Sequence, residues 1–358
     1  MPRVLIVGAG SMGLIIGYMF QLGGTEVTFL VRPHTAAKLD RPQKLYSFDE
    51  KKTHIFSGYK YLTDPSQVAP AAASAPFDFV LITLDGAALQ SVDGLKLVHA
   101  LGDAVRGTTP PHATKIVLGT CYYNILPWFL ATAGLTLDDV TCGALGIYSY
   151  PPQSFTLPLQ PTADVDTAQL SAADLAYVDH RSAAIWVNDE NPDIAKAFVE
   201  LFDRCGVSRA LVRPSAVGNL YLNSVFATFA ALDLMGWPAS TADIDTSSPV
   251  WRLGVAAHKE ILRLPMHGPA GVAAAEADGS EAGEGVVATL RDLETLLQPL
   301  DFMAFNKFHH GGKVLKQDTQ HLKKLLADAT AAGHAMPALT ELVAQVTAKQ
   351  SKEAAAEK

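Results

Sequence analysis

Two asparagine side chains interrupt an apolar stretch in the second half of the sequence. Asn219 and Asn223 lie four positions apart in "GNLYLNSVFATFAAL", residues 218–232. Residues four apart share one face of a helix, and a buried amide costs free energy unless its donors and acceptor find partners. We expect both amides to face a space that holds a ligand or ordered water, where they could polarise a carbonyl group. Partners inside the helical core are the alternative.

A glycine pattern near the N-terminus indicates a second kind of chemistry. "RVLIVGAGSMG" places Gly8, Gly10 and Gly13 between an apolar strand pattern and a helix pattern, the context in which G-x-G-x-x-G predicts dinucleotide binding. The first two glycines allow a tight turn and close approach of a pyrophosphate, and the third lets the helix pack on the strand. The backbone N–H groups of Ser11, Met12 and Gly13 would then face the phosphates.

The residue after the next predicted strand indicates which dinucleotide is bound. "EVTFLV", residues 26–31, is followed by Arg32, where an NAD site usually has Asp or Glu. Arg can pair with a 2′-phosphate, so NADP(H) is the predicted cofactor. His34 and Lys38 could add to that pocket. An exposed surface role for Arg32 is the alternative.

Two further buried strands are predicted, within "FDFVLITLDG" (77–86) and "TKIVLGTC" (114–121). Loops at the carboxyl ends of parallel strands line the ligand crevice. We therefore expect four residues to neighbour the cofactor: Leu84, Asp85, Gly119 and Thr120. Ordinary loop roles are the alternative. "AIWVN" (184–188) is predicted as the last strand of this domain, and residues 149–182 as extended structure and loops.

The second half of the chain has helical periodicity. Asn191 as N-cap and Pro192 at the first helical position begin a helix, and others are predicted over 218–232, from Ser248, over about 313–332 and from about 338. Residues 268–285 are predicted to form a mobile loop. The predicted fold class is α/β, with a Rossmann-type dinucleotide-binding domain (1–190), an all-α substrate or dimerisation domain (191–350) and a charged tail (351–358). The active site is expected in the cleft between the domains.

Composition limits the partners and the location. The 358 residues carry a net charge of −8 without a basic cluster, which argues against nucleic acid and anionic membranes. Cys121, Cys142 and Cys205 lack metal-ligand spacing, so no metal is expected. No leader pattern and no apolar run of membrane-spanning length is evident, so a cytoplasmic protein is expected. A small-molecule substrate is expected as the partner, and a homodimer is a further hypothesis.

The segments "VGAGSMG", "VTFLVR" and "AAGHAMPALTEL", together with the helical second half, resemble the ketopantoate reductase family. The resemblance implies NADPH-dependent reduction of a 2-oxo acid. It also implies a catalytic Lys four residues before a substrate-binding Asn on the first long helix of the second domain. Here Asn219 occupies the Lys position and Asn223 the Asn position, and the next Asn of the family is Ala227.

The resemblance implies three more correspondences. A Lys of the family corresponds to Asp85, an Asn falls near Thr120, and a substrate-orienting Glu falls near Gln317, to within a residue or two. An Asn amide can donate a hydrogen bond but cannot release a proton at neutral pH. Ketopantoate is therefore not the expected substrate.

Three hypotheses follow for the activity. The first is an NADPH-dependent reductase of another carbonyl or imine substrate, and "CYYNILPWF" and "FATFAALDLMGW" favour a hydrophobic one. The second is an NADP(H)-binding protein that catalyses a cyclisation or isomerisation, or only binds a ligand; a third is an opine-dehydrogenase-like condensation. The candidate proton donors are Tyr148, Tyr150, Tyr221, His258, Lys316 and His321. His309 and His310 are expected in an unliganded turn rather than a metal site.

Overall fold

The computed structural model describes residues 1–108, 113–160, 164–179 and 183–356. The chain divides into two compact units. The α/β unit comprises Met1–Thr156 with Asp164–Ser215, and the helical unit comprises Leu157–Ala163 with Ala216–Lys358.

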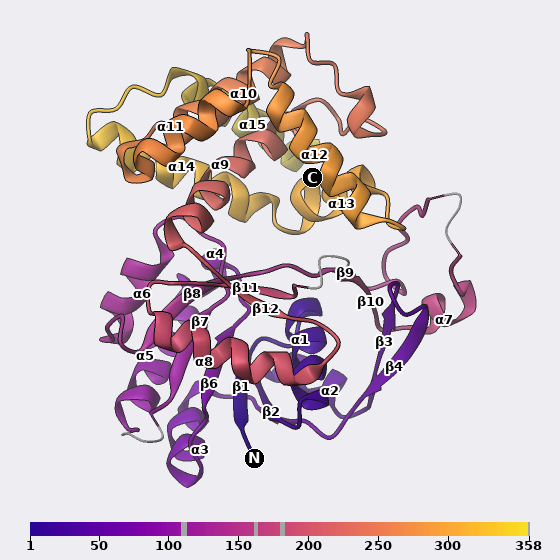
Figure 1. Cartoon of the computed structure of the whole chain (residues 1–358), viewed down its shortest axis with the longest axis vertical. Helices are drawn as coiled ribbons and strands as arrows, with labels where there is room; N and C mark the ends of the chain where they lie inside the picture. The colour runs from indigo at the N-terminus through magenta and orange to yellow at the C-terminus, as the bar shows by residue number, and fades with distance from the viewer. Residues whose placement is uncertain (109–112, 161–163, 180–182, 357–358) are drawn as a thin grey trace. The chain divides into compact units, whose positions relative to one another are not determined.

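An eight-stranded sheet forms the centre of the α/β unit (Figure 1). Its spatial order is β12-β11-β8-β7-β6-β1-β2-β5. The strands are β1 (Arg3–Val7), β2 (Glu26–Leu30), β5 (Lys60–Leu62), β6 (Phe79–Ile82), β7 (Lys115–Leu118), β8 (Val140–Leu145), β11 (Ile185–Asn188) and β12 (Ala210–Arg213). Only the pairing of β11 with β8 is antiparallel among these described strands. The strand order reverses between β1 and β6, and such a switch point is where dinucleotides bind in open α/β sheets.

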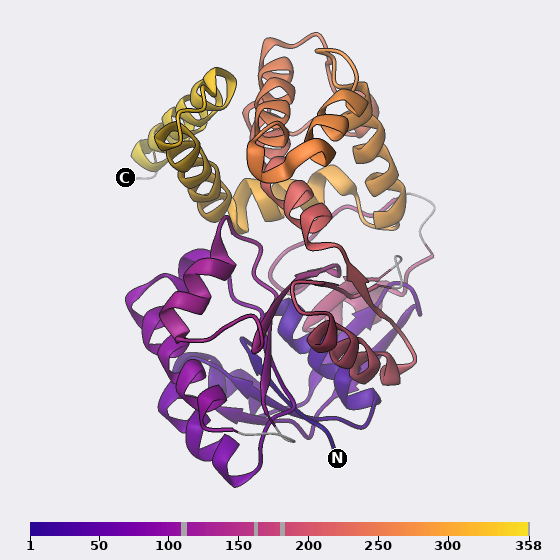
Figure 2. The ribbon, with the colours of Figure 1, turned by 60° about the vertical axis from the view of Figure 1, so that its left-hand side comes forward.

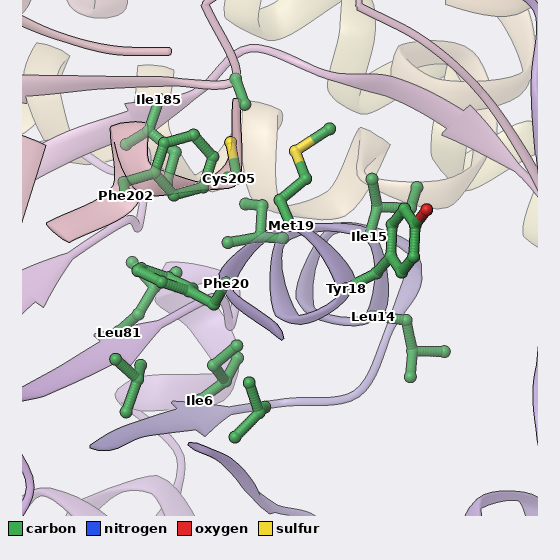
Figure 3. Close-up of a cluster of buried hydrophobic side chains, with 14 of the residues drawn as sticks. Ile6, Leu14, Ile15, Tyr18, Met19, Phe20, Leu81, Ile185, Phe202 and Cys205 are labelled. Atoms are coloured by element: carbon green, nitrogen blue, oxygen red, sulfur yellow. The ribbon is translucent and has the colours of Figure 1, made fainter. Parts of the chain in front are cut away.

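Both faces of this sheet are covered, as expected for parallel strands that are apolar throughout. Val4 and Ile6 of β1 join one apolar cluster, and Leu5 and Val7 join the other, because successive side chains point to opposite faces. The covering helices are α1 (Ser11–Leu22), α2 (Pro33–Leu39), α3 (Val68–Ser74), α4 (Gly86–Leu89), α5 (Val92–Arg106), α6 (Ile125–Ala133) and α8 (Pro192–Phe202). Figure 3 shows side chains of α1 meeting those of the sheet and of the segment that ends α8.

A second, four-stranded sheet follows the order β4-β3-β10-β9. It consists of β3 (Gln43–Ser47), β4 (Lys52–Phe56), β9 (Tyr148–Tyr150) and β10 (Leu175–Val178), accompanied by α7 (Thr167–Ala172). The prediction of extended structure and loops over 149–182 missed these pairings, because β10 pairs with β3, about 130 positions earlier in the chain, and β9 pairs with β10.

The predicted end of the first domain, at residue 190, is wrong. The sheet does not end at Asn188, because β12 pairs with β11 in parallel, with Val212 opposite Val187. Helix α8 is the crossover between these two strands, and its Phe198 packs edge-on against Phe20 and Phe79 at 5.7 and 5.2 Å. The helix therefore belongs to the α/β unit, which extends to Ser215.

The helical unit contains seven α-helices among its described residues (Figure 2). They are α9 (Ser215–Leu234), α10 (Pro249–Leu262), α11 (Gly268–Ala277), α12 (Glu284–Leu297), α13 (Phe302–Phe308), α14 (Leu315–Ala331) and α15 (Pro337–Ala356). A π-helical turn, His309–Lys313, joins α13 to α14. Short 3₁₀ turns elsewhere in the chain span Pro65–Gln67, Asp203–Cys205, Thr241–Asp243 and Pro265–His267. The Glu260 carboxylate of α10 accepts hydrogen bonds from the first N–H groups of α15, at Ala338 (2.9 Å) and Leu339 (2.8 Å).

Two predictions for this unit are wrong. Residues 268–285 are largely helical, since α11 occupies 268–277 and α12 begins at Glu284. The alanines of α11 are strong helix formers. Gly271 and Ala275 give this helix a buried face of small residues. The supposed charged tail continues α15 as far as Ala356.

One helix bears on the expectation that no apolar run reaches membrane-spanning length. By length and composition alone, α9 could cross a membrane, the one such helix among the described residues. However, 56 % of its apolar window is buried. Gly254 of α10 packs so closely on Ala231 of α9 that an added Cβ would lie 2.3 Å from the Ala231 Cβ. A helix in the core of a domain is buried in this way, so the apolar composition of α9 is only weak support for a membrane span.

Candidate active site

The glycine turn lies at the switch point of the large sheet and depends on the absence of side chains. Gly8 has a φ of +103°, which favours glycine. A Cβ on Gly13 would lie 2.0 Å from the Gly8 carbonyl oxygen, so only glycine lets α1 pack here. Gly10, by contrast, is exposed, and a Cβ there would meet nothing within 4 Å. The turn is therefore closed underneath and open above the N-terminus of α1, where a pyrophosphate would fit.

Thr83 supports this turn and was missed by the sequence reasoning. It directly follows β6, and its Oγ1 donates to the Val7 carbonyl at 2.9 Å. The same oxygen would lie 2.8 Å from a Cβ on Gly8, and the next residue, Leu84, also lies against Gly8. The sequence signal that could have identified Thr83 is a hydroxyl residue directly after β6, the strand that neighbours β1 across the switch point.

The residues predicted after β6 and β7 have defined local roles. The buried Thr120 donates its Oγ1 hydrogen to the Leu84 carbonyl at 2.8 Å, which ties the two loops together. The exposed Asp85 carboxylate accepts from the Ala88 N–H at 2.7 Å and so caps α4. A Cβ on Gly119 would lie 2.8 Å from the Ile82 oxygen, which requires glycine there. Contact of these residues with a cofactor remains a prediction.

Arg32 follows a strand whose last residue, Leu30, is hydrogen-bonded to the glycine turn. The Gly8 N–H donates to the Leu30 carbonyl at 2.9 Å, and Arg32 follows two residues later at the N-cap position of α2. Its guanidinium is exposed and makes no hydrogen bond or ion pair with any described residue. His34 and Lys38 are also exposed on α2. None of these three side chains pairs with a carboxylate of the described residues.

The two asparagines of α9 differ in burial. Asn219 is exposed, whereas Asn223 is only 6 % exposed, and that both amides face a ligand or ordered water remains a prediction. His321 of α14 hydrogen-bonds the backbone of Asn223, and its ring lies 4.6 Å from that of Phe226. Burial lowers the pKa of His321 to about 3, so this imidazole is neutral at ordinary pH.

Gln317 is half-buried on α14, next to a hydrogen-bonded pair formed by His310 and Asp318. The carboxylate of Asp318 lies 2.7 Å from Nδ1 of His310, and the His310 ring stacks on Phe229 at 4.0 Å with an interplanar angle of 14°. Burial raises the pKa of Asp318, an effect that its hydrogen bond with His310 opposes. Sequence reasoning placed His310 in an unliganded turn and missed this partner eight residues later.

The other candidate proton donors are placed as follows. Tyr150 is buried, which raises its pKa to about 12, and Tyr221 and Lys316 are exposed while Tyr148 is half-buried. His258 lies between the Ser224 carbonyl (3.0 Å) and Asp278 Oδ2 (2.8 Å). Over the described ranges, no group of three or more His, Cys, Asp or Glu side chains could hold a metal.

Comparison with known proteins gives a consistent result. Residues 4–103 match the family model described as ketopantoate reductase PanE/ApbA. No curated protein matches the chain significantly.

Solved structures match over the whole chain. A 2-dehydropantoate 2-reductase from Geobacter metallireducens is 17 % identical, with 97 % of this chain and 99 % of that chain covered and a TM-score of 0.63. One from Methylococcus capsulatus is 15 % identical, with 98 % and 97 % covered and a TM-score of 0.63. A D-mandelate dehydrogenase in complex with NADH is 12 % identical, with 98 % and 99 % covered and a TM-score of 0.63.

These likenesses confirm the predicted fold class, a Rossmann-type α/β unit followed by an all-α part. The resemblance inferred from the sequence is also confirmed: residues 4–103 match the ketopantoate reductase PanE/ApbA family, and the whole chain has the fold of these 2-dehydropantoate 2-reductases.

Proposed function

We propose that the protein is an NADPH-dependent reductase of a carbonyl or imine substrate other than ketopantoate. The observation that carries this proposal is the glycine turn at the switch point, open above Gly10 and followed by an unpartnered Arg32 after β2. The family model is that of a reductase, and a structure of the same fold holds NADH. Both support a nicotinamide dinucleotide as the cofactor.

The choice of NADPH over NADH rests on Arg32. When bound, NADPH supplies the hydride, and its 2′-phosphate is the feature that NADH lacks. An arginine can bind a phosphate in a bidentate manner. Lys38 would add positive charge beside it, and His34 would add a further hydrogen-bonding group. The site has no Asp or Glu at the position after β2 that would hold a ribose 2′-OH.

Arg32→Ala tests the cofactor assignment. Loss of a hydrogen bond to a charged group costs about 1.5–3 kcal/mol, so the Kd of NADPH should rise by about tenfold to hundredfold while that of NADH changes little. Arg209→Ala, which removes another exposed arginine of the same unit, is the control and should leave both constants unchanged. Equal weakening of NADPH and NADH by Arg32→Ala would contradict the 2′-phosphate contact.

The helical unit supplies the substrate residues in this proposal. Hydride addition builds negative charge on the substrate oxygen. The exposed amide of Asn219 makes no hydrogen bond with the described residues and so is available to donate one. We assign Asn219 and Asn223 to binding the substrate oxygen and Gln317 to orienting the substrate. Without a Lys at position 219, the ketopantoate reaction is not the expected one.

The substrate experiment follows the absorbance of the reduced nicotinamide in mixtures of protein, NADPH and a panel of 2-oxo acids, ketones and imines. Consumption of NADPH with hydrophobic members of the panel is expected. Tight NADPH binding without consumption by any member would instead favour a non-redox reaction such as a cyclisation. A homodimer and a cytoplasmic location remain predictions, and light scattering of the purified protein tests the first.

A further inference from the structure

We infer that Thr83 is a positioning residue for the cofactor of the reduction proposed above. Its hydroxyl group holds the peptide between Gly8 and Ala9 so that the Ala9 N–H points out of the glycine turn and donates to the pyrophosphate of the dinucleotide. The inference rests on the proposed function, because it concerns the same cofactor site. All the residues that it involves belong to the α/β unit.

The pairing of β1 with β6 brings Thr83 beside the turn. Val7 and Ile82, the last residues of these two strands, lie opposite each other, so the register places Gly8 opposite Thr83. The Thr83 N–H donates to the Val7 carbonyl at 3.0 Å and so continues the ladder past the end of β6. The backbone of Thr83 is therefore fixed by the sheet at the switch point.

The hydroxyl group of Thr83 bonds two carbonyl groups of the turn. Oγ1 donates to the Val7 oxygen at 2.9 Å and to the Gly8 oxygen at 3.3 Å. A hydroxyl group has a single hydrogen to donate, so the two oxygens share it. One side chain thus holds two successive carbonyl groups toward β6.

The Gly8 carbonyl group is enclosed from the other side by α1. A Cβ on Gly13 would lie 2.0 Å from the Gly8 oxygen, so this oxygen occupies the space of the missing side chain. A Cβ on Gly8 would lie 2.8 Å from Thr83 Oγ1 and 3.1 Å from Leu84 Cδ2. The Gly8 backbone is therefore confined between β6 and α1, and Thr83 supplies the hydrogen bond on the β6 side.

The orientation of this carbonyl group decides where the Ala9 N–H points. The Gly8–Ala9 peptide bond is trans, and the C=O and N–H of a trans peptide point in opposite directions within one plane. Because the Gly8 oxygen points toward Thr83 and Gly13, the Ala9 N–H points away from both. This N–H donates to none of the described residues, so it is available to a ligand.

The N–H groups near Ala9 suit an anion. The first N–H groups of a helix have no partner within the helix, and α1 begins at Ser11, two residues after Ala9. The first turn of α1 contains no acidic residue, and its N-cap, Gly10, provides no side-chain cap. A Cβ on Gly10 would meet nothing within 4 Å, so there is room above the turn. A pyrophosphate there can accept from Ala9 and from the start of α1 at once.

Thr83 and Arg32 act on different parts of the cofactor. The pyrophosphate is common to NADPH and NADH, whereas the 2′-phosphate that Arg32 is proposed to bind is present only in NADPH. Loss of the Thr83 hydroxyl group leaves the Gly8 carbonyl without its donor, so the Gly8–Ala9 peptide can rotate and turn the Ala9 N–H away from the pyrophosphate. Both dinucleotides should therefore be weakened by the same factor.

The experiment measures the Kd of NADPH and of NADH for Thr83→Val and Thr83→Ser. Valine has nearly the shape of threonine but no hydroxyl group, and we expect it to raise both constants by about tenfold. Serine keeps the hydroxyl group and should keep both constants near those of the wild type.

Thr114→Val is the matched control. Thr114 is buried, and its Oγ1 donates to the Phe77 carbonyl at 2.7 Å. It directly precedes β7, whereas Thr83 directly follows β6, so the two hydroxyl groups lie at opposite ends of parallel neighbouring strands. The control removes the same kind of hydrogen bond from the same unit and should leave both constants unchanged.

A nucleotide without a pyrophosphate separates positioning from general damage to the unit. Adenosine 2′-monophosphate carries the 2′-phosphate alone, so it should bind Thr83→Val as it binds the wild type. A wild-type Kd of NADPH in Thr83→Val would overturn the inference. Weakening of adenosine 2′-monophosphate by the same factor, or a Thr83→Ser variant as weak as Thr83→Val, would overturn it as well.

A second readout uses the wild-type protein and does not depend on the folding of Thr83→Val. Glycine labelled at its carbonyl carbon and alanine labelled at its nitrogen together select the amide signals of the three Gly–Ala pairs in the sequence, and the signal lost in Ala9→Ser belongs to Ala9. We expect this amide proton to shift downfield when NADPH binds. An Ala9 signal that does not respond to saturating NADPH overturns the inference while the proposed function stands. A wild type that binds neither NADPH nor NADH overturns the proposed function and this inference with it.

Discussion

The buried histidine of α14, His321, makes the stability of the helical unit depend on pH. Its side chain is 1 % exposed, and burial lowers its pKa from 6.5 to about 3. A group whose pKa is depressed by folding contributes stability that is present above the unfolded pKa and is lost as the pH falls toward the folded pKa. The protein should therefore lose stability between pH 6.5 and pH 3 through this residue.

The size of the effect follows from the difference between the two pKa values. That difference is about 3.5, and one pKa unit corresponds to about 1.4 kcal/mol, so complete acidification removes about 5 kcal/mol. Between pH 8 and pH 5, before the carboxylates of the protein protonate extensively, the free energy of unfolding should fall by about 2 kcal/mol.

Denaturant unfolding at a series of pH values, for wild type and His321→Leu, measures this. The leucine has a similar volume and does not titrate, so the variant should lack the loss of about 2 kcal/mol between pH 8 and pH 5. Leu325→Ala, which leaves a cavity on the same helix without removing a titrating group, is the control and should keep the wild-type slope. A His321→Leu variant with the wild-type slope would refute the reasoning.

Two further predictions concern the glycine turn and the start of α15. Gly13→Ala should abolish NADPH binding, because its Cβ would lie 2.0 Å from the Gly8 oxygen; fluorescence titration with NADPH checks this, and a wild-type Kd would contradict the tight packing. Glu260→Gln should destabilise the protein by about 1–2 kcal/mol, since it weakens charge-assisted bonds to two N–H groups of α15; unchanged unfolding would show that the carboxylate is not needed as a cap.

The strands and the glycine turn of the α/β unit were predictable because their signals are local. Gly8, Gly10 and Gly13 stand at fixed spacing between a β-branched run and a helix, and the turn requires Gly8 for its positive φ and Gly13 for its close packing. The caps of α8, Asn191 and Pro192, were local in the same way.

Pairings between distant segments were not predictable from the sequence. The sequence of β12 does not show that this strand belongs to the large sheet, because only its pairing with β11 in the fold does so. The predicted domain boundary was therefore too early in the chain. The alanine-rich 268–277 segment lacks an apolar stripe, because its buried positions are Gly271 and Ala275, which pattern reasoning does not score as core.

The candidate site shows the same division. The residues of the glycine turn and Arg32 were found from spacing, whereas Thr83 and the His310–Asp318 pair depend on side chains that meet only in the fold. His310 also lies in a π-helical turn, which no local pattern predicts.

The central claim is that the protein transfers a hydride from NADPH to a carbonyl or imine carbon. NADPH that carries deuterium at the transferring position of its nicotinamide, mixed with the protein and the substrate panel, tests this by mass spectrometry of the products. We predict one deuterium on the former carbonyl or imine carbon and an equal amount of NADP⁺. NADPH that binds tightly but keeps its deuterium with every substrate would contradict the claim.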